Sequence, residues 1–582
     1  LEAFEATPWN MKIMHDRGVL TSLNSDIPWL QSNLLYEMQK PVKYGGVSKQ
    51  DAMQMLTLNP AKQLRIDHLV GSLEVGKHGD IVLLNGDPFN TFTRVEKTIV
   101  DGIVYYDRLD EEARRGEPVR RIAGAQPEAQ VAGRQWAAVN APLVTDVQSV
   151  PAAQKLTDPV DRSPVVAITG GTVHPVSRAP IANGVVIMEN GVITAVGSAA
   201  EVQVPAGARR VDATGSHVYP GMMDPFTAVG LIDIDAISPA RDDREVGAFN
   251  PHVRSLFSIN PYSEGIFVGR ANGVTSILTT PGTGIVQGTA SVVALKGDTP
   301  EQMEIDSRNA MVVNFPSPSG DAWAEPALEG DNVVRLMDLF RRASEYVRQP
   351  SALRDPTAPW EVNTTASDRV LLESMVPAIT GQVPTIFVAQ RERDLRTLMM
   401  FLDSFPQVRA VVAGGAQAYH IADELARRNV AVIVGSTFEP TISRDDPVTA
   451  AWRNAEILRQ AGVKVSFTTS FSPETASELR NLPYAAAKAV AYGMPRDEAF
   501  RAITQNAAEI LGLGDIMGTL DVGKRADIIV VNDDPLQILA NVERMWIGGE
   551  EMPLVSKHSR LYEQFRTRQW TAPVVENGNG GR

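Results

Sequence analysis

Cysteine is absent from the 582 residues of this chain, which excludes disulfide bonds, thiolate nucleophiles and cysteine-ligated zinc. A chain without cysteine is slightly more typical of a periplasmic or secreted protein than of a cytoplasmic one. No apolar run reaches the about 20 residues that a membrane-spanning helix needs, so we expect no membrane span. The formal net charge of −14 argues against a nucleic acid or an anionic membrane as partner.

Histidine is scarce as well, and the eight residues are scattered. No two are spaced as His-x-His or four apart on a helix, which are the spacings that bring two imidazoles to one metal ion. The sequence therefore assigns no histidine as a metal ligand. The eight are His15, His68, His78, His174, His217, His252, His420 and His558.

The opening residues, LEAFEATPWN, lack the basic and apolar regions of a secretion leader and read like the interior of a domain. Hydrophobic residues make up 43% of the chain and charged residues 21%, which is ordinary for a globular protein. The length predicts two to four domains. We therefore expect a fragment or a processed product that begins inside a domain.

An internal repeat organises the chain. GSLEVGKHGDIVLLNGDPF at residues 71–89 matches GTLDVGKRADIIVVNDDPL at 518–536, with ten of nineteen positions identical and a constant offset of 447. The match extends upstream, where RGVLTSLNSD at 17–26 faces AGVKVSFTTS at 461–470 with an offset of 444. Self-similarity of this length indicates a duplicated unit. Residues 1–108 are then the tail of a first unit, and residues 165–582 contain a second.

Two patterns succeed one another in the second unit. Short β-rich runs with Asn-Gly and Gly-Gly turns come first and predict a small β-sandwich. After Asp224, short apolar strands alternate with helical segments, which predicts an α/β fold with a (β/α)₈ TIM-like barrel inserted in that sandwich. The glycine-rich stretch at 279–291 has no lysine after its glycines and is predicted as a βα loop.

These patterns predict seven segments along the chain. They are the C-terminal part of a first barrel with its last strand and helices (1–70), the last strands of a first β-sandwich (71–108), a linker rich in Ala, Pro, Gln and charge (109–164), the first strands of a second β-sandwich (165–222), a second barrel (223–516), the last strands of that sandwich (517–555) and a C-terminal tail (556–582).

The segments GVVIMENGVITAVG, VYPGMMDPF and GTLDVGKRADIIVVNDDP resemble the amidohydrolase superfamily, in its imidazolonepropionase-like and prolidase-like branch. The resemblance implies metal-assisted hydrolysis of a C–N bond, with one or two divalent cations, zinc first among them, at the mouth of the barrel. In that family His-x-His follows strand 1, single histidines follow strands 5 and 6, and an aspartate follows strand 8. The metal activates a bound water, and the aspartate moves its proton.

The second copy departs from this pattern at every ligand position. Phe226 and Ala228 replace the strand 1 pair, Val388 and Gly414 stand at the strand 5 and 6 positions, and Ser470 replaces the strand 8 aspartate. Phe, Ala, Val and Gly have no side-chain ligand atom. The second barrel is therefore predicted to be a pseudoenzyme. Metal-free catalysis by Ser470 or Thr469 is a weaker alternative, since no base or carboxylate partner is evident beside them.

The first copy keeps the strand 8 aspartate as Asp26, which the resemblance makes both metal ligand and proton carrier. Read alone, NSDIPW is also good turn chemistry, in which Asp26 only caps a turn. The repeat favours the functional interpretation. The neighbouring Trp29 is a candidate for the substrate pocket, or it packs the loop.

Two functions from different classes follow. In the first, the chain is part of a tandem hydrolase of a small amide, a dipeptide or a cyclic amide. Its active site is completed by a partner polypeptide that carries the front of the first unit, and a higher oligomer is possible. In the second, the assembly binds a ligand or a partner without chemistry. A tail of one strand and a few helices leaves open sheet edges and bare apolar faces, which is why we expect a tightly bound partner.

Overall fold

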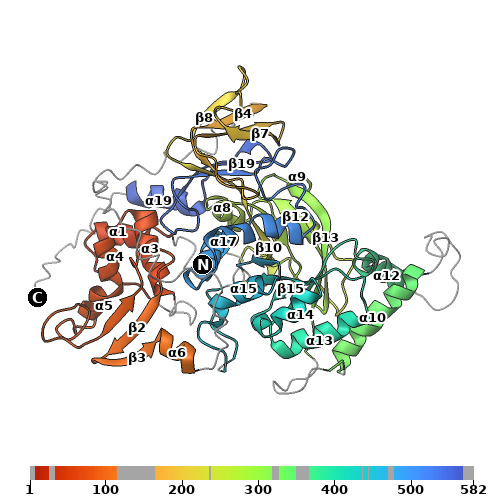
Figure 1. Cartoon of the computed structure of the whole chain (residues 1–582), viewed down its shortest axis with the longest axis horizontal. Helices are drawn as coiled ribbons and strands as arrows, with labels where there is room; N and C mark the ends of the chain where they lie inside the picture. The colour runs from red at the N-terminus through yellow and green to blue at the C-terminus, as the bar shows by residue number, and fades with distance from the viewer. Residues whose placement is uncertain are drawn as a thin grey trace, which may run out of the picture.

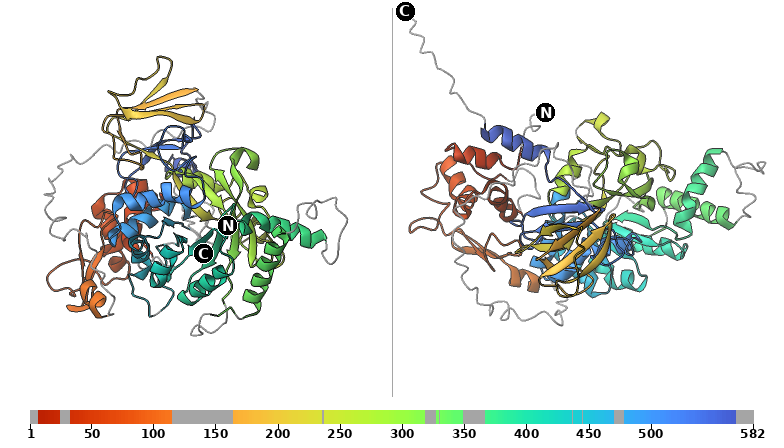
Figure 2. Two further views of the ribbon diagram at one scale, coloured as in Figure 1. Left: turned by 45° about the vertical axis from the view of Figure 1, so that its right-hand side comes forward. Right: turned by 90° about the horizontal axis from the view of Figure 1, so that it is seen from above.

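The computed structural model describes residues 7–24, 33–114, 164–234, 237–317, 327–328, 330–348, 366–435, 437–443, 445–469 and 478–567. Figure 1 shows a barrel at the centre, a group of β-strands above it, and a lobe formed by the N-terminal residues at one side. Both views in Figure 2 place this lobe on the opposite side of the barrel from α10 and α12. Within the described residues, no helix combines the length and the apolar character needed to cross a bilayer.

Eight strands form the central sheet in the order of the sequence. The first and last strands do not share a ladder, but the Thr468 hydroxyl donates a hydrogen bond to the carbonyl of Phe226 and so brings the two ends together. The barrel is thus nearly closed. Its strands are β10 (Met222–Thr227), β11 (Val274–Thr279), β12 (Val286–Ala294), β13 (Glu304–Asn314), β14 (Thr385–Ala389), β15 (Ala410–Gly414), β16 (Ala431–Val434) and β17 (Val465–Phe467).

One strand departs from the all-parallel barrel that the sequence predicts. β12 runs antiparallel to both β11 and β13. The stretch at 279–291 is therefore not a βα loop, because it contains a tight connection followed by the first part of β12. Residues 280–285 are too few for a crossover, which takes a dozen residues or more, so the chain can only turn back as a hairpin.

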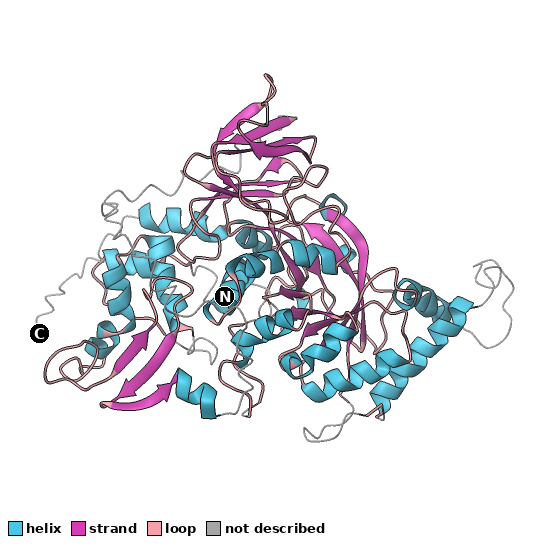
Figure 3. Cartoon of the chain, viewed as in Figure 1, coloured by secondary structure: helices cyan, strands magenta, loops and turns pink. Residues whose placement is uncertain are grey.

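Helices cover the outside of the barrel (Figure 3). The longest helix, α10 (Asp331–Arg348), is amphipathic and buries Leu336, Leu339 and Phe340 against the sheet. The barrel's helical elements are η2 (Ser238–Ala240), η3 (Ser255–Ser258), α8 (Glu264–Arg270), α9 (Pro300–Met303), α10 (Asp331–Arg348), α12 (Ala366–Ile379), α13 (Glu392–Asp403), η4 (Ala418–Ile421), α14 (Ala422–Arg427), α15 (Ala450–Gln460), α16 (Leu482–Ala491), α17 (Arg496–Ala502) and α18 (Gln505–Ile510), and α19 (Lys557–Thr567) follows near the end of the chain.

Two further sheets share one apolar core that includes Val186, Val218, Ile528 and Trp546. One sheet has the strand order β20-β19-β18-β9-β5 and the other β7-β6-β4-β8. Strands from before and after the barrel thus meet in a single layer. Their bounds are β4 (Val165–Thr169), β5 (Thr172–Val173), β6 (Gly184–Glu189), β7 (Val192–Ser198), β8 (Arg209–Asp212), β9 (His217–Pro220), β18 (Ile528–Val531), β19 (Val542–Ile547) and β20 (Glu550–Glu551).

The N-terminal lobe contains short helices and a three-stranded sheet of order β1-β2-β3. Its α4, α5, β1, β2 and β3 each begin 447 positions before α17, α18, β18, β19 and β20. The offset found in the sequence thus relates whole elements. The bounds are α1 (Asn10–Asp16), α3 (Leu34–Gly45), α4 (Lys49–Leu56), α5 (Leu58–Gln63), β1 (Ile81–Leu84), β2 (Val95–Val100), β3 (Ile103–Asp107) and α6 (Arg108–Arg114).

Residues 17–24, which the repeat predicts as the last strand of a first barrel, form no strand in the part of the segment that the structure describes. The equivalent β17 exists because it pairs with β16. A strand is defined by its ladder, and residues 17–24 have no such neighbour. Leu23 instead donates its N–H to the carbonyl of Met55.

The lobe contacts the second unit through equivalent residues. Asn90 accepts a hydrogen bond from the side chain of Gln537, and Thr91 accepts one from the N–H of Ile538. Both pairs are separated by 447 positions. A contact in which each residue meets its own equivalent lies on a two-fold axis, as in an isologous dimer. The lobe therefore sits where one protomer of a symmetric pair would sit.

Candidate functional site

Asp224 lies at the centre of the barrel's seam and is fully buried. One carboxylate oxygen accepts a hydrogen bond from the N–H of Phe226 at 3.1 Å. The other accepts from the N–H of Thr469 at 3.1 Å and from its hydroxyl at 2.8 Å. Since Phe226 follows in β10 and Thr469 follows β17, the carboxylate joins the first and last strands.

Burial raises the pKa of Asp224 to about 6, and the hydrogen bonds from Thr468, Thr469 and Phe226 oppose that rise. Desolvation disfavours the charged carboxylate, whereas N–H and O–H donors favour it. Both carboxylate oxygens of Asp224 thus accept hydrogen bonds from residues of the same barrel. The arrangement fits a structural clasp between strands.

The interior of this barrel is filled by apolar side chains. Phe226 is buried there against the apolar side chains that line the axis, and Val388 packs partly buried on the same cluster. Ala228 packs on the outer cluster between strands and helices. Gly414 ends β15, and a Cβ added to it would lie 2.3 Å from the Gln390 amide. Phe226 and Val388 share the interior, while Ala228 and Gly414 lie apart from it.

No group of three or more His, Asp or Glu residues within the described ranges could hold a metal ion. The residues of the second barrel that the structure describes therefore do not fit the metal that the resemblance implies. Ser470 lies outside the described residues. The Thr469 hydroxyl donates to Asp224, a carboxylate partner that the sequence did not reveal.

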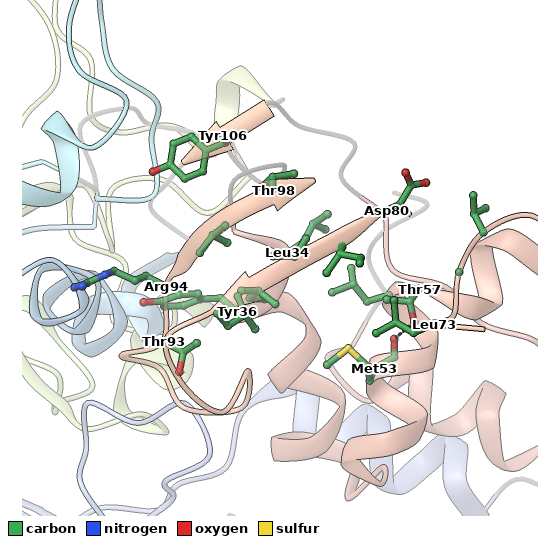
Figure 4. Close-up of a pocket in the computed structure, with 18 of the residues that line it drawn as sticks. Leu34, Tyr36, Met53, Thr57, Leu73, Asp80, Thr93, Arg94, Thr98 and Tyr106 are labelled. Carbon is green, nitrogen blue, oxygen red and sulfur yellow. Dashed lines mark hydrogen bonds between the residues drawn. The ribbon is translucent and has the colours of Figure 1, made fainter. Parts of the chain in front are cut away.

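Asp26 and Trp29, the two residues predicted for the first site, also lie outside the described residues. Among the described residues, a large cavity of about 1030 Å³ lies between the lobe and the second unit. Figure 4 shows Met53, Thr57 and Leu73 gathered beneath the strand that begins beside Asp80. α15 and α16 of the second unit close the other side with Trp452 and Lys488.

Lys488 is the one buried ammonium group in the lining of this cavity. Its Nζ donates a hydrogen bond to the Asn33 side chain at 2.8 Å. The same atom lies 4.7 Å from the ring centres of Tyr36 and Trp452. Burial lowers the pKa of Lys488 to about 7, and the hydrogen bond and the two rings favour the charged form.

The sequence analysis missed Lys488, although a signal was present. NLLYEMQK at 33–40 matches NLPYAAAK at 481–488, so Asn33, Tyr36 and Lys40 have identical equivalents in Asn481, Tyr484 and Lys488. The Lys488 contact to Asn33 and Tyr36 therefore joins the two copies of one motif. That contact depends on how the copies pack, which a repeat alone does not specify.

Two of the histidines contact each other outside the barrel. His174 and His217 lie on the strand group above the barrel, with their ring nitrogens 3.0 Å apart. The His174 ring stacks on Tyr219, with 4.1 Å between ring centres. Burial and the neighbouring His217 lower the pKa of His174 to about 4. His174 therefore packs as a neutral aromatic ring against Tyr219.

Comparison with known proteins finds similarity to amidohydrolases. The amidohydrolase family profile matches residues 10–105 and 410–552. A solved amidohydrolase from Thermotoga maritima MSB8 is 24% identical, with a TM-score of 0.59, and the match covers 66% of this chain and 99% of that one. This likeness is one of fold.

Two curated relatives extend the comparison. The amidohydrolase tasK of Hapsidospora irregularis is 25% identical over 396 residues, which are 63% of this chain and 39% of that protein. The imidazolonepropionase of Acidiphilium cryptum is 32% identical over 248 residues, which are 37% of this chain and 59% of that protein. The chain thus spans less than two thirds of the length of either relative.

Proposed function

Because this chain is a member of the amidohydrolase superfamily, we propose that it is part of a metal-dependent hydrolase of C–N bonds. Its relatives include proteins named imidazolonepropionase and adenine deaminase, which act on such bonds. An amide, a dipeptide or a cyclic amide is the substrate class. The active site belongs to the first unit and is completed by a polypeptide outside residues 1–582.

The contrast between the two copies carries this proposal. Both contain the closing helices and strands at a spacing of 447, but the second barrel holds Phe226 in an apolar interior. The aspartate that the family needs after strand 8 is kept only in the first copy, as Asp26. A duplicated protein that retains one site can use the other barrel as a scaffold.

In the proposed site, a divalent cation such as zinc supplies an activated water when it is bound. Asp26 would be a carboxylate ligand of the cation, and it would take a proton from the water and deliver it to the leaving nitrogen. Trp29 is the residue proposed to contact the substrate. The second barrel contributes the surface that holds the first unit, through Gln537, Ile538 and Lys488.

A non-catalytic binding protein is the second candidate. The observation that favours it is the filled interior of the second barrel, together with the absence of a metal-ligating group among the described residues. The two candidates differ in the fate of the first site. The metal content of the complete protein and the effect of replacing Asp26 on hydrolysis distinguish the two candidates.

The test uses the complete protein, isolated with every polypeptide that copurifies with this chain. We expect bound zinc or a similar divalent ion by elemental analysis, and hydrolysis of members of a panel of dipeptides and cyclic amides. Asp26→Asn should lower kcat/KM by about three orders of magnitude, because it removes an anionic ligand and the proton carrier.

The matched control is Ser470→Asn, at the equivalent position of the second copy. We expect it to leave kcat/KM and metal content unchanged. Full activity in the Asp26→Asn protein, or a complete preparation without metal, would contradict the proposal and favour the binding protein.

A further inference from the structure

The N-terminal lobe exposes apolar side chains whose equivalents in the second unit are buried. Leu64 is 71% exposed and Leu511 2%, Leu73 is 79% exposed and Leu520 0%, and Val82 is 53% exposed and Ile529 0%. Each pair is 447 positions apart. Large exposed apolar faces mark binding surfaces, and here the same molecule contains a covered version of the same face.

In the second unit, one extended segment covers much of this face. β9 pairs antiparallel with β18 and sets Tyr219 opposite Ile529. After β9, Gly221 donates its N–H to the carbonyl of Asp527, and Met223 donates to the carbonyl of Ile503, both at 2.9 Å. The segment thus passes between the edge of a sheet and the helices α17 and α18.

The side chains of that segment fill the space between the sheet and the helices. The Tyr219 ring lies 4.9 Å from the ring of Phe500, and its hydroxyl accepts a hydrogen bond from Arg496 at 3.0 Å. Met222 packs in the same apolar cluster as Ile529. Sheet edge, helix and strand together form one core.

The lobe has the equivalent sheet edge and groove, and no strand from the part of the chain that the structure describes pairs with β1 on its outer side. β1 is the edge of its three-stranded sheet in the described part of the chain. Met53, Leu56 and Val82, the equivalents of Phe500, Ile503 and Ile529, line the 1030 Å³ cavity. The residue four positions after Leu56 is Pro60, which has no N–H to donate to the Leu56 carbonyl.

We infer that the edge of β1 and the groove between β1 and α4 are the docking site for one β-strand of a polypeptide outside residues 1–582. The inference rests on the proposed function, since that polypeptide is the missing front of the first unit. The strand pairs antiparallel with Ile81–Leu84 and places a large apolar or aromatic side chain over Met53. Its following N–H groups reach the carbonyls of Asp80 and Leu56.

Other occupants fit less well. In a second copy of this chain, β9 is already paired on both sides, with β18 and with β5. A swap would therefore break as many ladder bonds as it makes. The predicted linker at 109–164 lacks the alternating apolar run that an inserted strand needs.

The test uses the full chain and a fluorescein-labelled peptide with the sequence of residues 214–225, TGSHVYPGMMDP, which is the second unit's own version of the strand. We expect saturable binding by fluorescence anisotropy and slower amide hydrogen exchange at Ile81–Leu84. Val82→Glu should weaken binding at least tenfold, because it puts a charge in the groove. A shuffled peptide should not bind.

The matched control is Val104→Glu, on the exposed face of β3. The equivalent residue in the second unit is already a glutamate, Glu551, so we expect binding as in the unchanged chain. No saturable binding, equal weakening by both variants, or dimers of the chain that the peptide does not dissociate would overturn the inference.

The inference and the proposed function can fail separately. Peptide binding with the expected response to Val82→Glu, in a protein whose complete form hydrolyses nothing, leaves the docking site and removes the hydrolase. Hydrolysis by the complete protein that Val82→Glu does not affect leaves the hydrolase and removes the docking site.

Discussion

Asp224 has a structural role where the first and last strands of the barrel meet. Its carboxylate accepts hydrogen bonds from Phe226 and Thr469 and faces no metal-ligating group within the described residues. Two backbone N–H groups from opposite ends of the sheet depend on it. Removing the carboxylate would leave buried donors unpaired, which costs about 1–3 kcal/mol for each.

We therefore expect Asp224→Ala to lower the free energy of unfolding by about 2–4 kcal/mol while the metal content of the complete protein stays the same. The folded pKa of about 6 lies above the ordinary value of about 3.9. The Asp224 carboxyl thus contributes most to the free energy of unfolding at low pH, and this contribution is lost as the pH rises through 6. Urea unfolding at pH 5.0 and 7.5 should show a difference between the two proteins that is larger at pH 5.0 by about 1–2 kcal/mol.

A conservative Asp224→Asn change is the comparison, since the amide keeps one acceptor and cannot ionise. Its stability should lie between those of the other two proteins and should vary less with pH. Loss of metal together with Asp224 would contradict the view that this barrel has no site.

At the scale of elements, α3 and α16 meet as two copies of one helix. Lys488 of α16 contacts Asn33 and Tyr36 at the start of α3. From the other side, Lys43 of α3 donates to the Tyr484 hydroxyl at 2.6 Å. Burial raises the pKa of Tyr484 to about 12, so this hydroxyl stays neutral. Polar contacts between equivalent helices fix how the two copies pack.

Lys488 gives a pH-dependent test of this packing. Its folded pKa of about 7 lies below the ordinary lysine value of about 10.4, so the folded chain loses its proton first. Burying the ammonium costs most below pH 7, and the cost falls as the pH rises towards 10.4. Lys488→Met should therefore stabilise the chain at pH 7 relative to pH 9.5, by about 1–3 kcal/mol.

Urea unfolding at the two pH values measures this difference. The matched variant is Lys40→Met, at the equivalent position of the first copy. Lys40 forms an ion pair with Glu37 at 2.6 Å and is partly exposed, so we expect less than 1 kcal/mol of change between the two pH values. Equal responses of the two variants would show that Lys488 is not desolvated.

Pattern and repeat predicted several elements well, and their failures have physical reasons. The matching segments at 71–89 and 518–536 predicted β1 and β18 at the same spacing, because each segment encodes its strand locally. Residues 17–24 resemble β17 but form no strand in the described part, because pairing needs a neighbour that local sequence cannot provide. The stretch at 279–291 is predicted as a βα loop, but its residues from Val286 onward belong to β12, since glycine-rich composition does not reveal that this segment pairs with β11 and β13.

The candidate site was predicted less completely than the fold. Losses such as Phe226 could be read directly, because a phenyl ring cannot bind a metal. The Asp224–Thr469 contact joins residues 245 positions apart, and the Lys488–Asn33 contact joins residues 455 apart. Such distant pairs follow from barrel closure and from the packing of two units, neither of which leaves a local pattern.

At the scale of the whole molecule, equivalent positions of the internal repeat differ in exposure. The two copies share sequence and element spacing, yet Leu64 and Leu73 are exposed where Leu511 and Leu520 are buried. Burying a leucine side chain contributes about 1.5–3 kcal/mol. Leu511 and Leu520 therefore stabilise the fold by their burial, whereas Leu64 and Leu73 do not.

Equivalent pairs of substitutions should therefore differ strongly in their effect on the free energy of unfolding. Leu64→Gln with Leu73→Gln should change the free energy of unfolding by less than about 1 kcal/mol and reduce binding of the apolar dye ANS. Leu511→Gln with Leu520→Gln should cost about 4–8 kcal/mol, because each change loses apolar burial and buries an amide. Urea unfolding and ANS fluorescence of the isolated chain measure both effects. If the proposed partner polypeptide binds, the first pair of substitutions should become destabilising in the complex as well, since the partner would then bury Leu64 and Leu73 in a core. If Leu64→Gln with Leu73→Gln remains silent in the complete protein, no partner covers these two side chains, and the lobe's apolar face would have to be a surface of the finished molecule.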